Sequence, residues 1–505
     1  MQTAPTRSPY ARSALIAAGA AVAGMLLLGA LASRRHKGGL PIMSVADTLA
    51  FIAEVPLPAL AKGVIIRRKT VVGLAEATDI EKRALRRMQR VQEKYGPGPV
   101  LLGIPFRNLA IILEPGDVER VLAETPEPFA SASREKKAAL SHFEPHGSLI
   151  SHGSERAERR RFNEQVLESA CPVHSLNNRF AQIVRNEALD LLSAAKPSGE
   201  FGWEEFERSW FRLVRRVVLG DSARDDVEFY HLLTQLRSDA NWAFFKPRRT
   251  ALREEFLSRL QAYIDRPEPG SLAALAAVAP KDQVTKPEHQ AAQWLFAFDP
   301  AGMATSRALA LLAGHEDRSL EARREAPAVE RADAELPLLR ASILESLRLW
   351  PTTPMILRET TKPTRWRGSE MPAGSGIVIF APYFHRDDRQ LDFAHRFEPE
   401  IWLEEPVANG YPLVPFSGGP GICPARHLVL MVGSRFLAEL LRHHDIRLAD
   451  PERIDPSELP AILDPYTMRF IARAVPSSGK ATDRRTTAPE TTKDSLQPAS
   501  QAEPV

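Results

Sequence analysis

Apolar residues recur at helical spacing over most of the chain, and this pattern dominates from about residue 115 onward. The clearest predicted helices span residues 155–168, 178–194, 204–219, 251–263, 290–313, 336–349 and 425–443. A further helical stretch ends at Tyr95, and short apolar runs predict strands over residues 100–104, 109–113, 355–359 and 376–380. Because these strands do not alternate regularly with helices, the pattern indicates a mainly helical fold rather than a doubly wound sheet.

The two ends of the chain differ from the region between them. Residues 13–32 carry no charge and are about as long as the ~20 residues that span a bilayer, and the basic residues after them favour a cytoplasmic main domain. We therefore predict a membrane anchor with a basic linker over 1–42, a globular domain over 43–476 and a disordered polar tail over 477–505. Two other interpretations stay open: a secretory signal cleaved after Ala32, and a cytoplasmic protein whose translation starts at Met43.

Charge and cysteine content exclude several classes of protein. Lys and Arg total 66 against 63 Asp and Glu, so the net charge of +3 gives no field that would favour a nucleic-acid partner. The two cysteines, Cys171 and Cys423, are too few for a zinc site or an iron–sulfur cluster held by four thiolates. Cys171 has no glycines around it, and we interpret it as an inert buried thiol.

Cys423 lies in a glycine-rich segment, residues 415–426, that is followed at once by an amphipathic helix. A glycine turn lets several backbone N–H groups point at one sulfur atom, and the helix N-terminus adds a positive dipole. Both effects lower the pKa of a thiol and stabilise a ligating thiolate. Two alternatives stay open at this point: a small buried residue beside a flexible loop, and a phosphate loop, although the Gly-Lys-Ser/Thr ending of such loops is missing.

The spacing of this segment resembles the cysteine loop of the cytochrome P450 family. Phe416, Gly419 and Cys423 match the family pattern. Gly421 departs from it, because the family usually has Arg or His there, and Ala425 stands where it usually has Gly. The resemblance implies haem b as cofactor, with Cys423 as the axial ligand of its iron and with Phe416 and Gly419 shaping the site. It also implies the P450 fold, mainly α with a small β lobe near the N-terminus.

A Glu-x-x-Arg motif lies upstream of the cysteine by about the family's usual interval. Glu345 and Arg348 are three residues apart on a predicted helix, so they share a face and can form an ion pair. Taken alone, such a pair is usually a solvated surface bridge. The resemblance implies instead a structural pair behind the haem, completed by an Arg of a downstream segment, but Ile401 stands at that position.

Ala301, Gly302 and Thr305 resemble the oxygen-activation stretch of the family's long distal helix. There the Thr hydroxyl organises water that delivers protons, which makes Thr305 the predicted catalytic residue. Ala304 replaces the family's usual acid, and Asp299 lies six residues before Thr305, well round the helix from it. The other interpretation is a plain buried helix with a proline kink.

Three arginines are candidates for binding the haem propionates. Arg156 and Arg160 occupy the positions of the aromatic or His residue and of the Arg in the family's Trp-x-x-x-Arg helix. Arg358 matches a strand arginine that usually reaches the other propionate. A run of arginines is otherwise more often a solvated helix face.

The resemblance covers roughly residues 90 to 475 and implies a monooxygenase. Such an enzyme inserts one oxygen atom of O2 into a small apolar organic substrate. No flavin- or NADPH-binding region follows the cysteine helix, so we expect a separate electron donor, a ferredoxin or a reductase. Two alternatives are a P450-type enzyme driven by peroxide or acting on a hydroperoxide as isomerase or dehydratase, and a haem-binding protein without turnover.

Overall fold

A computed structural model describes residues 39–403 and 412–475, apart from residues 106, 196 and 332. The predicted anchor over 13–32 and the predicted tail over 477–505 therefore lie outside the described residues. Within the described ranges, no helix combines the length and the apolar character that crossing a bilayer requires.

The seven clearest predicted helices are all present, with ends that differ by at most a few residues from the predicted ones. They are α8 Gly153–Val166, α9 Asn177–Ala195, α10 Trp203–Leu219, α12 Thr250–Asp265, α14 Pro287–Gly314, α16 Pro337–Leu349 and α18 Arg426–Leu441. Local chemistry sets their ends. α10, for example, stops at Gly220, whose φ of 114° is open to glycine but rarely to other residues.

The helical stretch that ends at Tyr95 is four helices rather than one. They are α2 Val45–Glu54, α3 Pro56–Lys62, α4 Lys69–Ala77 and α5 Ile80–Tyr95. Breaks occur where the backbone becomes left-handed, at Gly63 and at Asp79. The remaining α-helices are α6 Pro115–Ala123, α7 Arg134–Leu140, α11 Val227–Ala240, α13 Leu272–Val278, α15 Glu316–Glu325 and α17 Ala381–His385. Short 3₁₀ turns include η4 Ala243–Phe245, η6 Pro399–Trp402 and η7 Gly419–Gly421.

Strands form one five-stranded sheet and two smaller ones. The larger sheet has the order β1-β2-β8-β5-β3, with β1 Val100–Leu101, β2 Leu109–Ile111, β8 Gly376–Phe380, β5 Met355–Thr360 and β3 Phe129–Ala130. Only β2 and β8 pair in parallel, in the register Leu109↔Gly376. The smaller sheets are β4-β10-β9 (Glu200–Gly202, Arg469–Ala474, His444–Leu448) and β6-β7 (Thr364–Trp366, Ser369–Met371). Two of these three sheets thus join strands that lie far apart along the chain.

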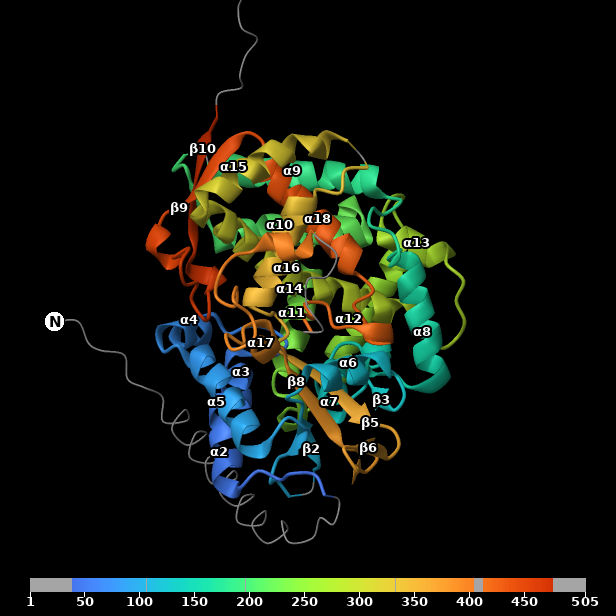
Figure 1. Cartoon of the computed structure of the whole chain (residues 1–505). Coiled ribbons are helices and arrows are strands. Elements are labelled where there is room, and N and C mark those ends of the chain that lie inside the picture. The colour runs from blue at the N-terminus through green and yellow to red at the C-terminus, as the bar shows by residue number, and fades with distance from the viewer. Residues whose placement is uncertain (1–38, 106, 196, 332, 404–411, 476–505) are drawn as a thin grey trace, which may run out of the picture.

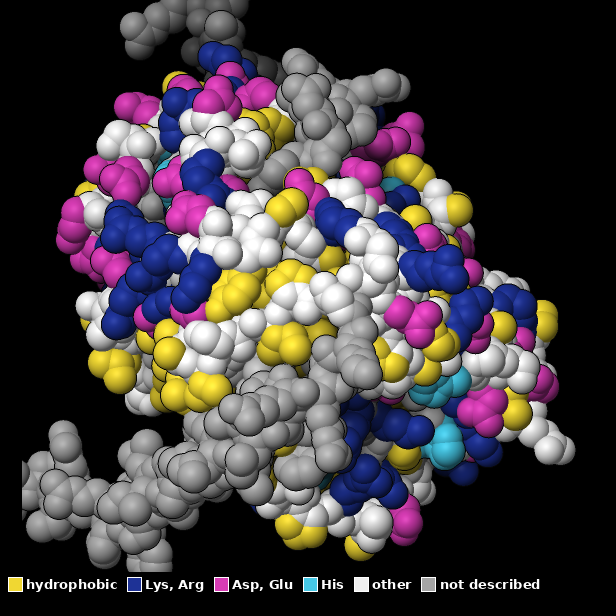
Figure 2. Space-filling view, turned by 60° about the horizontal axis from the view of Figure 1, so that its bottom comes forward, with side chains coloured by type: hydrophobic (Ala, Val, Ile, Leu, Met, Phe, Trp, Pro, Cys, Tyr) yellow, Lys and Arg dark blue, Asp and Glu magenta, His cyan; other side chains and the backbone are white. Residues whose placement is uncertain are grey.

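The helices and the larger sheet bury two separate cores. One core lies among α9, α10, α14, α16 and α18, where the rings of Phe206, Trp210 and Phe436 pack together. The other lies between the five-stranded sheet and the N-terminal helices. In Figure 1 the blue N-terminal helices and this sheet occupy the lower part of the molecule, and α9, α10 and α18 the upper part. Figure 2 shows basic and acidic side chains interspersed over the viewed face.

Candidate functional site

The cysteine loop is held by backbone contacts before it enters α18. Cys423 N donates to Phe416 O at 3.0 Å, which closes the loop on itself. Gly419 has a φ of 57°, and a Cβ at this position would collide with the Leu122 carbonyl oxygen at the end of α6. Glycine is therefore required at position 419 both for its backbone conformation and for the close approach of α6.

Burial dominates the chemistry of the Cys423 thiol. It raises the pKa of Cys423, while the Ala425 backbone N–H and the charges of Arg160 and Arg426 lower it in part. In the ligand-free protein, removal from water disfavours the thiolate more than the loop favours it. The expectation for Cys171 is wrong, because that thiol is exposed.

Arg358 brings an almost fully buried positive charge to the loop. Its side chain is 2% exposed, and it donates to Thr125 Oγ1 and to Ser417 Oγ, each at 3.1 Å. Burial, and secondarily the charge of Arg156, lower the pKa of Arg358 to about 10. Among the described residues, the guanidinium of Arg358 lacks counter-charge, because the hydroxyl groups that accept its hydrogen bonds carry no negative charge.

The other two predicted arginines reach the same loop from α8. Arg160 Nη1 donates to Ile422 O at 2.7 Å, and its Nε pairs with Glu164 at 2.5 Å. Arg156 Nη2 lies 3.5 Å from Pro420 O, and burial lowers the pKa of Arg156. The structure therefore brings Arg156, Arg160 and Arg358 together around the loop of Cys423.

Lys136 of α7 is a fourth cation near these arginines, and the sequence analysis did not identify it as a site residue. Its Nζ donates to Ser131 O and to Leu357 O, each at 3.1 Å. Burial, followed by the charge of Arg358, lowers the pKa of Lys136 well below its usual value. Leu357 is 221 residues away along the chain, so no local pattern could have indicated this contact.

The donors around Cys423 fit a dianionic, thiolate-ligated cofactor. Within the described ranges, Arg156, Arg358 and Lys136 have no carboxylate within ion-pair distance, so the site holds more positive than negative charge. A Cβ on Gly421 would lie 2.8 Å from Arg358 Nη2, so this guanidinium occupies the space that the family's Arg or His would need. The haem that the resemblance implies carries two carboxylates, which would supply the missing counter-charge.

Glu345 and Arg348 form a fully buried pair, both 0% exposed. Arg348 Nε and Nη2 donate to the two carboxylate oxygens at 2.8 and 2.6 Å. Arg348 also donates to the backbone carbonyls of His385, Phe393, Ala394 and Arg396. The pair therefore ties α16 to the segment between α17 and η6 rather than forming a solvated bridge.

The third partner of this pair is an indole. Trp402 Nε1 donates to Glu345 Oε2 at 2.9 Å, and Glu398 N donates to Oε1 at the same distance. The sequence departs from the family pattern at Ile401, and Trp402, the next residue, satisfies the carboxylate in its place. A buried carboxylate needs several donors, and an indole N–H is one that carries no charge.

The predicted oxygen-activation stretch lies in α14 and is buried throughout. Thr305 Oγ1 donates to Ala301 O at 2.9 Å, and it would lie 2.8 Å from a Cβ on Gly433 of α18. Gly302 faces the other way: a Cβ there would lie 2.7 Å from Trp210 Nε1. Close packing of α14 against α10 and α18 thus needs small residues at these positions.

Asp299 is engaged elsewhere. It forms an ion pair with Arg237 of α11, whose side chain is 1% exposed and which also donates to Ile65 O. Asp299 therefore serves as the counter-charge of a buried guanidinium, one turn before Met303 of the same helix.

Comparisons with known proteins point to one family. The family model described as Cytochrome P450 matches residues 299–470. The chain is 35% identical to Tabersonine 16-hydroxylase 2 of Catharanthus roseus and 31% identical to Demethylepipodophyllotoxin synthase of Sinopodophyllum hexandrum. These alignments cover 23% and 27% of this chain and 24% and 27% of the relatives. The chain thus spans about a quarter of the length of the curated relatives it matches.

Solved structures share the fold over most of the chain. A retinoic acid-bound cyanobacterial CYP120A1 matches with a TM-score of 0.61 at 18% identity, covering 77% of this chain and 94% of that one. The cytochrome P450 CYP102L1 matches with a TM-score of 0.63 at 18% identity, covering 78% and 94%.

Proposed function

Because this chain belongs to the cytochrome P450 family and has its fold, we propose that it is a haem-thiolate monooxygenase. It inserts one oxygen atom of O2 into a small apolar organic substrate, with electrons from a separate donor, a ferredoxin or a reductase. The observation that carries the proposal is the loop of Cys423: four cations lie around it, and three of them, Arg156, Arg358 and Lys136, have no carboxylate partner among the described residues.

Each residue of the site has a defined role in this proposal. Cys423 would bind the haem iron as its axial ligand, and Phe416 and Gly419 would shape the loop that presents the sulfur. Four cations would hold the propionates: Arg156, Arg160, Arg358 and Lys136. Haem b, when bound, supplies the activation of dioxygen, which thiolate ligation favours by donating electron density to the iron. Glu345 and Arg348 keep the segment behind the loop in place.

Lys136→Gln is expected to change the haem-free and the haem-loaded protein in opposite directions. Without haem, burial lowers the pKa of Lys136, so folding releases a proton and stability rises with pH from the lowered value up to the usual 10.5. The substitution removes this slope and stabilises the haem-free form at neutral pH. With haem bound, it removes a counter-charge and speeds haem loss. Thermal unfolding between pH 7 and 9.5 and haem transfer to a scavenger protein measure the two effects.

Lys137→Gln is the matched control, since Lys137 is the exposed neighbour on the same helix. It should leave both measurements unchanged. If Lys136→Gln destabilised the haem-free form as well, Lys136 would be a structural residue rather than a propionate ligand.

Thr305→Ala is expected to lower the ratio of product formed to NADPH consumed and to raise peroxide release, while leaving haem binding unchanged. A positioned proton donor contributes roughly 10²–10⁴-fold to a rate, and Ala304 offers no carboxylate to replace it. The ratio of product to NADPH is measured during reductase-driven turnover. The substrate is an apolar compound identified because its binding shifts the spin state of the haem iron. Ser306→Ala, at the next buried position, is the control.

An unchanged ratio in Thr305→Ala would remove Thr305 from proton delivery. A second candidate function, a peroxide-driven enzyme, is favoured by the missing acid at Ala304 and by the bond between Thr305 and the Ala301 carbonyl. This second function would replace the proposed one if peroxide alone supports faster turnover than the reductase does. Haem binding without either activity would indicate a non-catalytic haem protein.

We also propose that residues 13–32 anchor the protein in a membrane, with the domain over 43–476 in the cytoplasm and a polar tail over 477–505. Exposed apolar side chains on two neighbouring segments support a membrane-facing side. They are Leu57, Leu60, Trp242, Phe244 and Phe245. Arg68 stacks over the Trp242 ring at 5.2 Å, and Asn241 accepts from Ile65 N, so the two segments lie together.

A further inference from the structure

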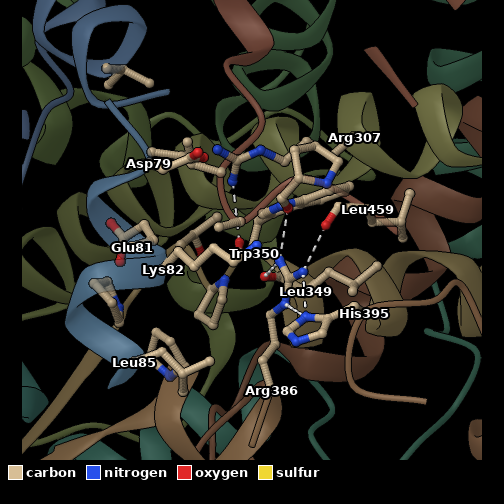
Figure 3. A pocket seen from close by; sticks show the side chains of 18 of the residues that line it. Asp79, Glu81, Lys82, Leu85, Arg307, Leu349, Trp350, Arg386, His395 and Leu459 are labelled. Atoms are coloured by element: carbon tan, nitrogen blue, oxygen red, sulfur yellow. Dashed lines mark hydrogen bonds between the residues drawn. The ribbon is translucent and has the colours of Figure 1, made fainter. Parts of the chain in front are cut away.

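A pocket of about 310 Å³ lies apart from the cysteine loop. Figure 3 shows α5, with Glu81 and Leu85, on one side of it, and Arg307, Trp350 and Arg386 on the other. The segment from 459 to 466 completes the wall. Cys423 and the four cations around its loop do not line this pocket. A volume of this size is at the lower end of the ~300–1,000 Å³ that small-molecule sites occupy.

Three cations converge on one end of the pocket. Arg307 of α14 is 8% exposed and donates to Leu463 O at 2.9 and 3.1 Å. Arg67 Nη2 donates to Thr352 O at 2.6 Å. Lys62 is 7% exposed and pairs with Glu81. In the part of the chain that the structure describes, no carboxylate lies within ion-pair distance of Arg67 or Arg307.

Burial and neighbouring cations disfavour the charged forms of Lys62 and Arg307 in the absence of an anion. Burial, followed by the charges of Arg67 and Arg307, lowers the pKa of Lys62 to about 7. Burial, with a smaller contribution from the charge of Arg67, lowers the pKa of Arg307 to about 10. Backbone carbonyls satisfy the N–H donors of the arginines, but they do not cancel two guanidinium charges. An anion at this end would relieve the repulsion.

The rest of the pocket is largely apolar, and its acids other than Glu81, which pairs with Lys62, are exposed. Apolar lining residues include Val72, Leu85, Met303, Trp350 and Ile462. The acidic residues Asp79, Asp388 and Glu458 are exposed. We propose that this pocket binds an apolar carboxylic acid, with the carboxylate at Lys62, Arg67 and Arg307 and the hydrocarbon part against the apolar lining.

This site goes beyond the proposed function, because the ligand meets a different side of α14 from Thr305. Met303 and Arg307 are four residues apart and share one side of the helix, whereas Thr305 lies about 200° round from Met303 at 100° per residue. Tyr466 borders the ligand side, where its hydroxyl lies 3.5 Å from Met303 Sδ. The inference therefore does not depend on turnover at Cys423.

Calorimetric titration of the full-length, haem-loaded protein tests the site with decanoate, decan-1-ol and decylammonium as probes. Decanoate is expected to bind at least about tenfold more tightly than the alcohol, because only the carboxylate makes charge-assisted hydrogen bonds to the buried cations. Decylammonium should bind least. Arg67→Met is expected to weaken decanoate binding about tenfold and leave the affinity for the alcohol unchanged.

Arg68→Met is the matched control, since Arg68 donates to Leu60 O and Ala61 O and does not line the pocket. Equal affinity for acid and alcohol in the unaltered protein would overturn the proposal without any variant. Equal weakening of decanoate binding by Arg67→Met and Arg68→Met would also overturn the proposal. Charge-selective binding in a protein that lacks a thiolate-type CO spectrum would contradict the proposed function and leave the carboxylate site intact.

Discussion

Replacing Cys423 by alanine is expected to abolish the thiolate-type absorption band of the reduced, CO-treated protein. The sulfur is the only ligand that the loop offers to an iron at the N-terminus of α18, and alanine keeps the loop's backbone contacts to Phe416. Thiolate ligation, and not haem binding as such, produces this band, so the band reports directly on the Fe–S bond. The measurement is the CO difference spectrum of the full-length protein.

Cys171→Ala is the control for this experiment. Cys171 is exposed, and the Cys171→Ala protein should keep the full thiolate-type band. If Cys423→Ala retained the band, or if Cys171→Ala lost it, the assignment of the axial ligand would fall, and with it the proposed function.

Glu345→Ala is expected to lower the free energy of unfolding by about 3–5 kcal/mol, the usual cost of breaking a buried ion pair by removing one partner. The substitution leaves the Arg348 guanidinium at 0% exposure without a counter-charge. It also leaves the Trp402 indole and the Glu398 backbone N–H without their acceptor. Urea unfolding of the haem-loaded protein measures the loss.

Glu321→Ala is the matched control, because Arg318 and Glu321 form a pair with the same three-residue spacing on the surface of α15. Exposed pairs contribute about 0–1 kcal/mol. A loss in Glu345→Ala no larger than in this control would mean that Glu345 and Arg348 do not hold the segment behind the cysteine loop.

Local patterns in the sequence determined a large part of the fold. Seven helices follow from the spacing of apolar residues, and their ends follow from residues such as Gly220. The predicted strands over 355–359 and 376–380 are present as β5 and β8, while those over 100–104 and 109–113 are shorter than predicted. The cysteine loop and the Glu345–Arg348 pair were also visible, because their spacing is short. In each case the interacting groups lie close together along the chain, so a short stretch of sequence contains both partners.

Only the tertiary structure decided which charges are buried and what neutralises them. Lys136 reaches Leu357 across 221 residues, and Arg358 of β5 fills the space beside Gly421 of η7. Trp402 takes the place expected of an arginine at Ile401, and Cys171 is exposed rather than buried. The physical reason is that desolvation and ion pairing depend on groups brought together from distant segments. A residue's own neighbours along the chain define its helix or strand, whereas its pKa, its partner and its ligand depend on the surfaces packed against it.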